Sequence, residues 1–144
     1  LAIADIAAAE PIYQLVTATE AQDSETAVAK GLVEKSTVPK AVDVLAPRIE
    51  VVQPTMALPL VNPFNVVVRF ITQSDAQLDT KSLKVKYGFF RIDVTERMMA
   101  AAIWKGNEVT SNGAAAPKGK HRFYVQIADS KQRLRESEMV IIVR

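Results

Sequence analysis

The chain has 144 residues and a formal net charge of +2, and it contains no cysteine and a single histidine, His121. A chain of this length can bury a core of its own, and 49% hydrophobic with 24% charged residues is typical of a folded protein. The missing cysteines exclude disulfides, thiolate nucleophiles and zinc–thiolate sites, and a single histidine excludes metal sites with two imidazole ligands. No apolar run is long enough to cross a bilayer, so we expect no membrane span.

Charge is distributed unevenly along the chain. Residues 1–46 hold seven acidic and three basic side chains, for a charge of −4, whereas residues 47–144 carry +6. Such a shift often marks a boundary between two units. The basic part lacks clustered arginines with interleaved aromatic residues, and its charges alternate with apolar residues as on a solvated sheet face. We therefore expect no nucleic-acid binding.

Residues 1–46 are predicted to be an N-terminal extension or linker that is weakly helical or partly disordered. Residues 1–9 are small and apolar without a preceding basic region, which leaves open whether they end a signal sequence. Residues 17–35 have a thin apolar stripe, which predicts one or two marginal helices capped by Thr19 or Ser24. Residues 37–47 have Pro39 and Pro47 at their ends, which is typical of a linker. We expect this whole segment to be separable from the rest of the chain.

Residues 47–144 are predicted to form an all-β unit. Alternating or continuous apolar residues predict strands at 48–53, 64–72, 82–88, 120–129 and 133–143. The valine-rich run at 64–72 is the strongest of them, and we expect it to be buried on both faces. Regular spacing with turn signals between the strands favours an antiparallel β-sandwich. Its predicted core consists of Val66, Val68, Phe70, Leu83, Val85, Phe123, Val125 and Ile127.

One stretch interrupts the strand pattern. Residues 93–103 contain strong helix formers behind a cap at Asp93 or Thr95, which predicts a short helical insertion between strands. Asn107 and the pair of Asn112 and Gly113 then predict turns.

Several short motifs follow one another in order after residue 46. They are PRIEVVQP at 47–54, NPFNVVVRF at 62–70, the step from Asp79 into the next strand, APKGKHRF at 116–123 and the turn at Asp129. In this order the chain resembles a bacterial immunoglobulin-like module of the fibronectin-III kind over about residues 46–144. The resemblance implies an immunoglobulin-like β-sandwich and is nearly silent on function.

The chain departs from the antibody pattern in three respects. It has no cysteine pair to bridge the sheets, and its Trp104 lies near the expected helix rather than on a core strand. The tyrosine expected at the corner of such a fold is replaced by Phe123 or displaced to Tyr124. The last difference leaves open which group makes the corner hydrogen bond.

His121 is the first residue to consider for catalysis. Its neighbours Lys120 and Arg122 are expected to lower its pKa and keep it neutral. We interpret it as a strand-edge histidine hydrogen-bonded to backbone rather than as a general base.

The aspartates are the next candidates. Asp75, Asp79 and Asp93 lack the spacing of a calcium loop, and we interpret them as turn caps. Asp79 and Asp93 are the pair that could converge as an acid/base couple, but nearby lysines would lower both pKa values, whereas a general acid needs a raised one. We therefore predict no enzymatic activity, no cofactor and no tightly bound metal.

Met98, Met99 and Trp104 form the candidate contact surface of the module, together with Ile103. Residues at helical spacing are more often core, and this alternative stays open.

The leading functional hypothesis is a noncatalytic immunoglobulin-like module for interaction or structure. The resemblance places it in a bacterial cell-envelope, periplasmic or secreted protein, where its partner would be another protein or further domains of a longer chain. One alternative is a small glycan- or ligand-binding β-sandwich, with Trp104, Tyr87 and Phe89 as an aromatic platform. Another is an accessory domain of a larger enzyme. The sequence does not determine the ligand or the oligomeric state.

Overall fold

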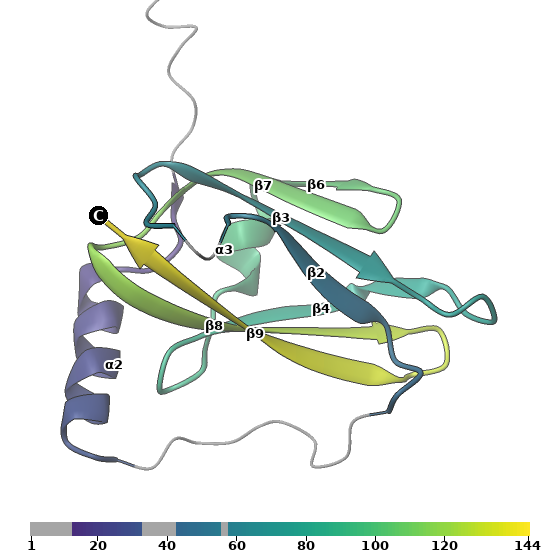
Figure 1. Ribbon diagram of the computed structural model, residues 1–144, viewed down its shortest axis with the longest axis horizontal. Helices are drawn as coiled ribbons and strands as arrows, with labels where there is room; N and C mark the ends of the chain where they lie inside the picture. Colours follow the sequence, from purple (N-terminus) through teal and green to yellow (C-terminus); the bar gives the residue numbers. More distant parts are fainter. Residues whose placement is uncertain (1–12, 33–42, 56–57) are drawn as a thin grey trace, which may run out of the picture.

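The computed structural model describes residues 13–32, 43–55 and 58–144. In this part of the chain two β-sheets face each other and helix α2 lies beside one end of them (Figure 1). The elements in chain order are β1 (Tyr13–Gln14), α2 (Ala18–Ala29), β2 (Arg48–Gln53), β3 (Phe64–Ile71), β4 (Leu78–Tyr87), β5 (Ile92–Asp93), α3 (Thr95–Met99), β6 (Ala102–Lys105), β7 (Glu108–Ala115), β8 (Gly119–Asp129) and β9 (Leu134–Val143).

The two sheets are almost entirely antiparallel. The first has the order β1-β7-β3-β2, with β6 also paired to β7, and the second has the order β5-β4-β8-β9. Only β1 runs parallel to its partner β7 among these strand pairs of the described chain. The predominantly β fold with antiparallel sheets that the sequence predicts is therefore confirmed. No helix in the described ranges is both long and apolar enough to span a membrane.

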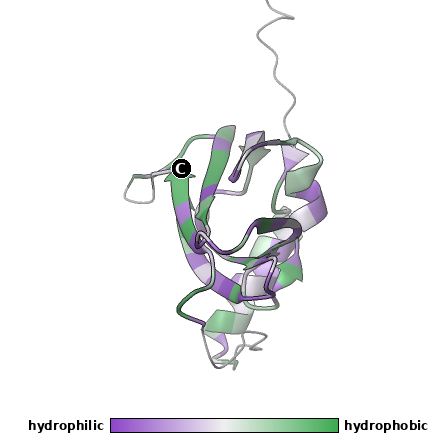
Figure 2. Cartoon of the chain, turned by 90° about the vertical axis from the view of Figure 1, so that its right-hand side faces the viewer, coloured by the Kyte–Doolittle hydropathy of each residue, from purple (hydrophilic) through white to green (hydrophobic). Residues whose placement is uncertain are grey.

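The core lies between the sheets and agrees with the predicted period of two. All eight predicted core residues are buried, each with at most 4% of its surface exposed. Hydrophobic and hydrophilic residues alternate along the strands (Figure 2). The predicted burial of both faces of the valine-rich strand is wrong, because β3 alternates strictly and Val67 on its other face is only half-buried. This strand therefore has one core face and one outer face.

β8 is buried on both faces in its middle part, from Phe123 to Ile127. Tyr124 and Gln126 point away from the core but are covered, since the Arg91 guanidinium lies 3.7 Å from the centre of the Tyr124 ring. Arg91 also forms an ion pair of 3.1 Å with Glu136, whose carboxylate accepts a hydrogen bond from Gln126. The solvated face predicted here is thus a packed polar layer over the second sheet.

β7 is a strand where the sequence predicts a turn. Its Asn112 and Gly113 lie within the strand, and Gly113 has φ +80°. The register against β3 passes from Phe64–Ala114 to Val66–Ser111, so that β7 holds one extra residue, as in a β-bulge. The Asn–Gly pair therefore does indicate a left-handed conformation, but the chain reversal predicted from it is wrong.

The short helical insertion that the sequence predicts is present as α3. α3 ends at Met99, and residues 102–105 form β6, which pairs with β7. Trp104 lies on this strand, and its ring centre is 5.9 Å from that of Phe70. Pairing of residues 102–105 with β7 satisfies backbone groups that a longer helix would have satisfied internally.

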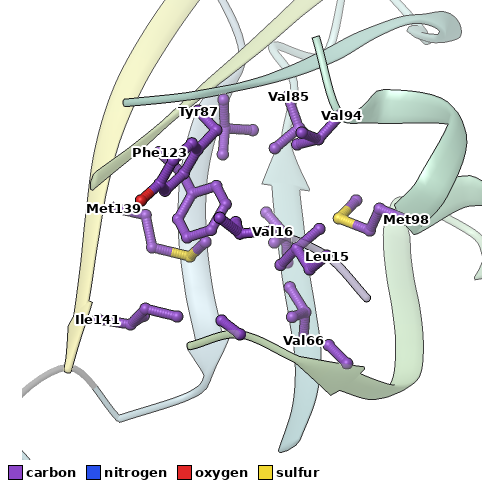
Figure 3. Packing of buried hydrophobic residues seen from close by; sticks show 14 of the residues in the cluster. Leu15, Val16, Val66, Val85, Tyr87, Val94, Met98, Phe123, Met139 and Ile141 are labelled. Atoms are coloured by element: carbon purple, nitrogen blue, oxygen red, sulfur yellow. The ribbon is translucent and has the colours of Figure 1, made fainter. Parts of the chain in front are cut away.

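The N-terminal segment enters the core. Leu15 and Val16 are 1% and 0% exposed and lie among Val66, Met98 and Met139 (Figure 3). α2 begins at a capping box of Thr17 and Glu20, so the predicted caps at Thr19 and Ser24 are wrong. Residues 13–16 thus contribute core, which argues against the expectation that residues 1–46 are separable. The predicted linker and any second helix fall largely outside the described residues, as do residues 1–9.

Candidate functional site

A pocket of about 470 Å³ lies between α2, the loop after β4 and the start of β8. Figure 1 shows these three elements meeting at the end of the second sheet. Residues at positions 21, 24, 25, 28 and 29 of α2 line it, at the spacing of one helix face. Its volume is within the range of small-molecule sites, roughly 300–1,000 Å³.

An ion pair holds the first turn of α2. The Arg97 guanidinium donates to both carboxylate oxygens of Glu20, at 2.6 and 2.8 Å, and also to the carbonyl of Leu15 at 3.1 Å. The hydrogen bonds from Arg97, with a smaller contribution from Thr17, lower the pKa of Glu20 to about 2. This ion pair therefore joins the first turn of α2 to α3.

A close approach at Ser24 holds the middle of α2. The backbone N–H of Phe89 donates to Ser24 Oγ at 2.8 Å. Gly88 has φ +71°, and a Cβ on this residue would lie 2.7 Å from Ser24 Oγ. Glycine therefore fits this position for two reasons. It adopts a left-handed backbone conformation without strain, and it has no side chain that would collide with Ser24 of α2.

The floor of the pocket is a buried pair of His121 and Tyr87. Tyr87 Oη and His121 Nδ1 are 2.8 Å apart, and His121 Nε2 is 2.6 Å from the carbonyl of Pro117. Because a carbonyl only accepts, Nε2 carries the proton, and the neutral ring accepts at Nδ1 from the tyrosine hydroxyl. Both ring nitrogens are thus engaged within the protein.

Burial sets the pKa values of this pair. It lowers the pKa of His121, against the raising effect of the hydrogen bond to Pro117 and of the Glu25 charge. Burial also raises the pKa of Tyr87 to about 12, with a contribution from the negative charges of Glu20 and Glu25. The predicted direction for His121 is confirmed, but its predicted cause is wrong, because Lys120 and Arg122 are exposed on the opposite face of β8. His121 is also not at a sheet edge, since β8 lies between β4 and β9.

The rim of the pocket is basic. Lys118, Lys120 and Arg122 line it from β8 and the residue before it, and Glu25 faces them from α2. Arg122 lies 3.4 Å from Glu138, in a pair that is about half exposed. The pocket therefore combines apolar walls with a net positive mouth.

The predicted aromatic platform is only partly assembled. Tyr87 and Phe89 line the pocket, together with Tyr124. Trp104 lies on β6 in the other sheet, against Phe70, so it does not join them.

The predicted contact surface is also divided. Met98 is 2% exposed and belongs to the core, while Met99 and Trp104 are half-buried against it. Ile103 is exposed. Met98 thus follows the alternative that residues at helical spacing are core, and it cannot contact a partner at the surface.

The three aspartates make structural contacts. Asp79 accepts from the N–H of Lys81, and Asp93 accepts from the N–H of Thr95 at the start of α3, as turn caps do. Asp75 instead binds Lys131 and Arg133, which lower its pKa to about 2.

Asp79 and Asp93 do not converge. Asp93 pairs with Lys86, seven residues along β4 from Asp79, which separates the two positions by about 20 Å. In the described ranges no three histidine, aspartate or glutamate side chains are grouped to hold a metal ion.

Comparison with known proteins gives no relative: no family model, no curated protein and no solved structure matches this chain. The pocket is therefore interpreted from its own geometry. Sequence reasoning missed Ser24, Gly88 and Lys118 as site residues. A usable signal was present at Gly88, a glycine that ends a regular alternating strand.

Proposed function

We propose that this chain is a noncatalytic binding module with an immunoglobulin-like β-sandwich, and that the pocket beside α2 is its binding site. The pocket is the observation that carries the proposal. It brings together three segments far apart in sequence, and specific contacts at Glu20 and Ser24 hold its helical wall in place. A preformed concave site lined by aromatic and aliphatic groups is the usual form of a ligand site.

The strand order supports the immunoglobulin-like part of the proposal. Read from β2 onward, one sheet has the order β2-β3-β7-β6 and the other β5-β4-β8-β9. The first corresponds to strands A, B, E and D of an immunoglobulin domain, and the second to C, F and G with one added strand beside C. The assignment rests on this strand order and on the resemblance of the sequence motifs, since no family model and no solved structure matches the chain.

A corner hydrogen bond adds to this argument. In immunoglobulin domains a tyrosine near the start of strand F donates back to backbone a few residues upstream. Here His121, near the start of β8, donates to the carbonyl of Pro117 four residues earlier. We infer that His121, rather than Phe123 or Tyr124, makes the corner hydrogen bond that a tyrosine makes in immunoglobulin domains.

The chemistry of the site supports a binding role rather than catalysis. The pocket's histidine has both nitrogens hydrogen-bonded within the protein, and the pKa of its Tyr87 partner is raised to about 12. Glu25 faces lysines and arginine instead of a second carboxylate. A histidine engaged at both nitrogens and a carboxylate without a second carboxylate beside it favour binding over acid–base catalysis.

The biological setting is carried by the resemblance to bacterial immunoglobulin-like modules. On that basis the chain belongs to a cell-envelope, periplasmic or secreted protein, and acts beside another protein or further domains of a longer chain.

Nuclear magnetic resonance tests the binding role directly. Amide shifts of the ¹⁵N-labelled full chain are followed while small aromatic and aliphatic compounds are added. We expect perturbations to gather at α2, at residues 87–89 and at residues 118–122. In Ala29→Trp, whose new ring fills the pocket from an exposed position, these perturbations are lost. Perturbations confined to Met99 and Trp104, or none at all, would contradict the proposed site.

A further inference from the structure

The walls of the pocket are apolar. Ala21, Val28 and Ala29 line it from α2, and the largely buried Tyr87, Phe89 and Tyr124 line it from the sheet side. Val28 is 65% exposed although it is aliphatic. Exposed apolar surface beside a preformed hollow is a feature of ligand sites, because a bound apolar group removes that surface from water.

Few polar groups at the floor are free to bind a ligand. The hydroxyl of Tyr87 and the ring of His121 bind each other and the carbonyl of Pro117. The oxygen of the Ser24 hydroxyl already accepts a hydrogen bond from the N–H of Phe89. A sugar, which needs several convergent hydrogen bonds, would leave its hydroxyls poorly matched in this interior.

The mouth of the pocket has an excess of positive charge. Three basic residues line the mouth, Lys118, Lys120 and Arg122, and one acidic residue, Glu25, lines it from α2. The other nearby carboxylate, Glu20, is bound to Arg97. Arg122 shares Glu138, whereas neither lysine has an ion-pair partner among the described residues. Two free ammonium groups at the edge of an apolar hollow favour an anionic group on the ligand.

We infer that the pocket binds a small amphipathic carboxylate, with its apolar body between α2 and the sheet and its carboxylate beside Lys118 and Lys120. This inference rests on the proposed binding function and specifies its ligand class. Flat aromatic or short aliphatic acids have this combination of an apolar body and one negative end.

Three probes that share one ring system and differ in charge test the inference. They are 2-naphthoate, 2-naphthylmethanol and 2-naphthylmethylamine, titrated at neutral pH and low salt into the full chain. We expect naphthoate to bind about tenfold more tightly than the alcohol, and the ammonium form of the amine to bind more weakly than both. Raising the salt concentration should reduce the preference for naphthoate and leave the alcohol nearly unchanged.

Lysine variants test whether the preference for naphthoate arises at the mouth of the pocket. Lys118→Glu with Lys120→Glu should abolish the preference for naphthoate or reverse it, while affinity for the alcohol stays within about twofold. Lys105→Glu is the control, because this exposed lysine lies at the end of β6 in the other sheet. It changes the net charge in the same direction, by two units against four in the double variant, without touching the pocket. Thermal unfolding of each variant verifies that it is folded.

The outcomes separate the inference from the proposed function. If all three probes bind equally and Ala29→Trp abolishes their binding, the pocket is a ligand site but the carboxylate preference is overturned. If Lys105→Glu matches the double variant, the preference is only an effect of net charge and the inference is likewise overturned. If no probe binds, or if Ala29→Trp leaves binding unchanged, the proposed function of the pocket fails as well.

Discussion

The N-terminal segment 13–29 and the β8–β9 hairpin pack against the same core but reach it by different routes. The hairpin is built from ten consecutive residue pairs, from Gly119–Val143 to Ala128–Leu134. The N-terminal segment depends on contacts with residues far along the chain: Tyr13 binds Ser111 across 98 positions, and Glu20 binds Arg97 across 77. A local pattern can encode the first arrangement, whereas only the folded chain reveals the second.

Removal of residues 1–45 should have the largest effect. It deletes Leu15 and Val16 from the core and leaves Arg97 without Glu20. Burial of two large aliphatic side chains contributes roughly 3–6 kcal/mol, a large share of the stability of a domain of this size. We therefore expect a chain starting at Ala46 to lose its cooperative unfolding transition near the temperature of the full chain. A calorimetric transition that stays in place would show the segment to be separable, as the sequence suggests.

Two core substitutions compare the regions residue by residue. Leu15→Ala should cost about 2–5 kcal/mol and Val125→Ala about 1–3 kcal/mol, because each leaves a cavity between the sheets. Both residues are at most 2% exposed. Leu32→Ala is the control in the N-terminal segment, since Leu32 is half exposed and should change stability by about 0.5 kcal/mol or less. Chemical denaturation measures all three, and equal small losses at Leu15 and Leu32 would refute the role given to residues 13–16.

The strands could be predicted because their signal is local. β2 agrees with its predicted bounds, and the inward residues of β3, β4 and β8 follow a period of two that one buried face imposes. β7 could not be predicted in this way because Ser111, Asn112 and Gly113 have turn chemistry, which here forms a bulge inside a pairing with β3. Its strand state comes from its neighbours rather than from its own residues.

The pocket could not be predicted for a related reason. Its three segments are held together by contacts between distant residues that no local pattern reveals, such as the ion pair of Glu20 with Arg97 and the hydrogen bond from the N–H of Phe89 to Ser24. The thin apolar stripe of α2 predicts no more than a marginal helix, yet its spacing places Ala21, Val28 and Ala29 along one wall. A helix with little apolar surface can thus dock through polar contacts, and amphipathicity alone does not reveal it.

A substitution at Gly88 should test this docking with a smaller effect. Gly88→Ala forces a left-handed backbone onto alanine, at about 1–2 kcal/mol, and also drives a methyl group into Ser24 Oγ. Gly106→Ala is the matched control, because Gly106 has φ +59° and a methyl group added there would meet no heavy atom within 4 Å. We expect Gly88→Ala to be the more destabilising of the two. Ser24→Ala removes the hydroxyl oxygen that would lie 2.7 Å from the new methyl group but keeps the Cβ at 3.1 Å. In this background the difference between the two losses should therefore shrink, and an unchanged difference would exclude contact with Ser24 Oγ as its cause.

The pH dependence of stability should show the smallest effect, and the single histidine makes it readable. Burial keeps His121 neutral in the folded chain and holds its pKa below the ordinary value of about 6.5 that it regains on unfolding. Below pH 6.5 the unfolded chain therefore binds a proton that the folded chain does not, so the free energy of unfolding falls as the pH decreases, by at most about 1.4 kcal/mol per pH unit. The carboxylates whose pKa values are lowered, Glu20 and Asp75 among them, lose their stabilising effect only at a more acidic pH, below about 4.5.

Urea unfolding between pH 7 and 5 thus isolates the contribution of the histidine. His121→Gln supplies the control, since its amide can donate to Pro117 and accept from Tyr87 without titrating. We expect the free energy of unfolding to slope with pH for the native chain and to be flatter for the variant. Parallel profiles would mean that a group other than the histidine at the pocket floor gains the proton.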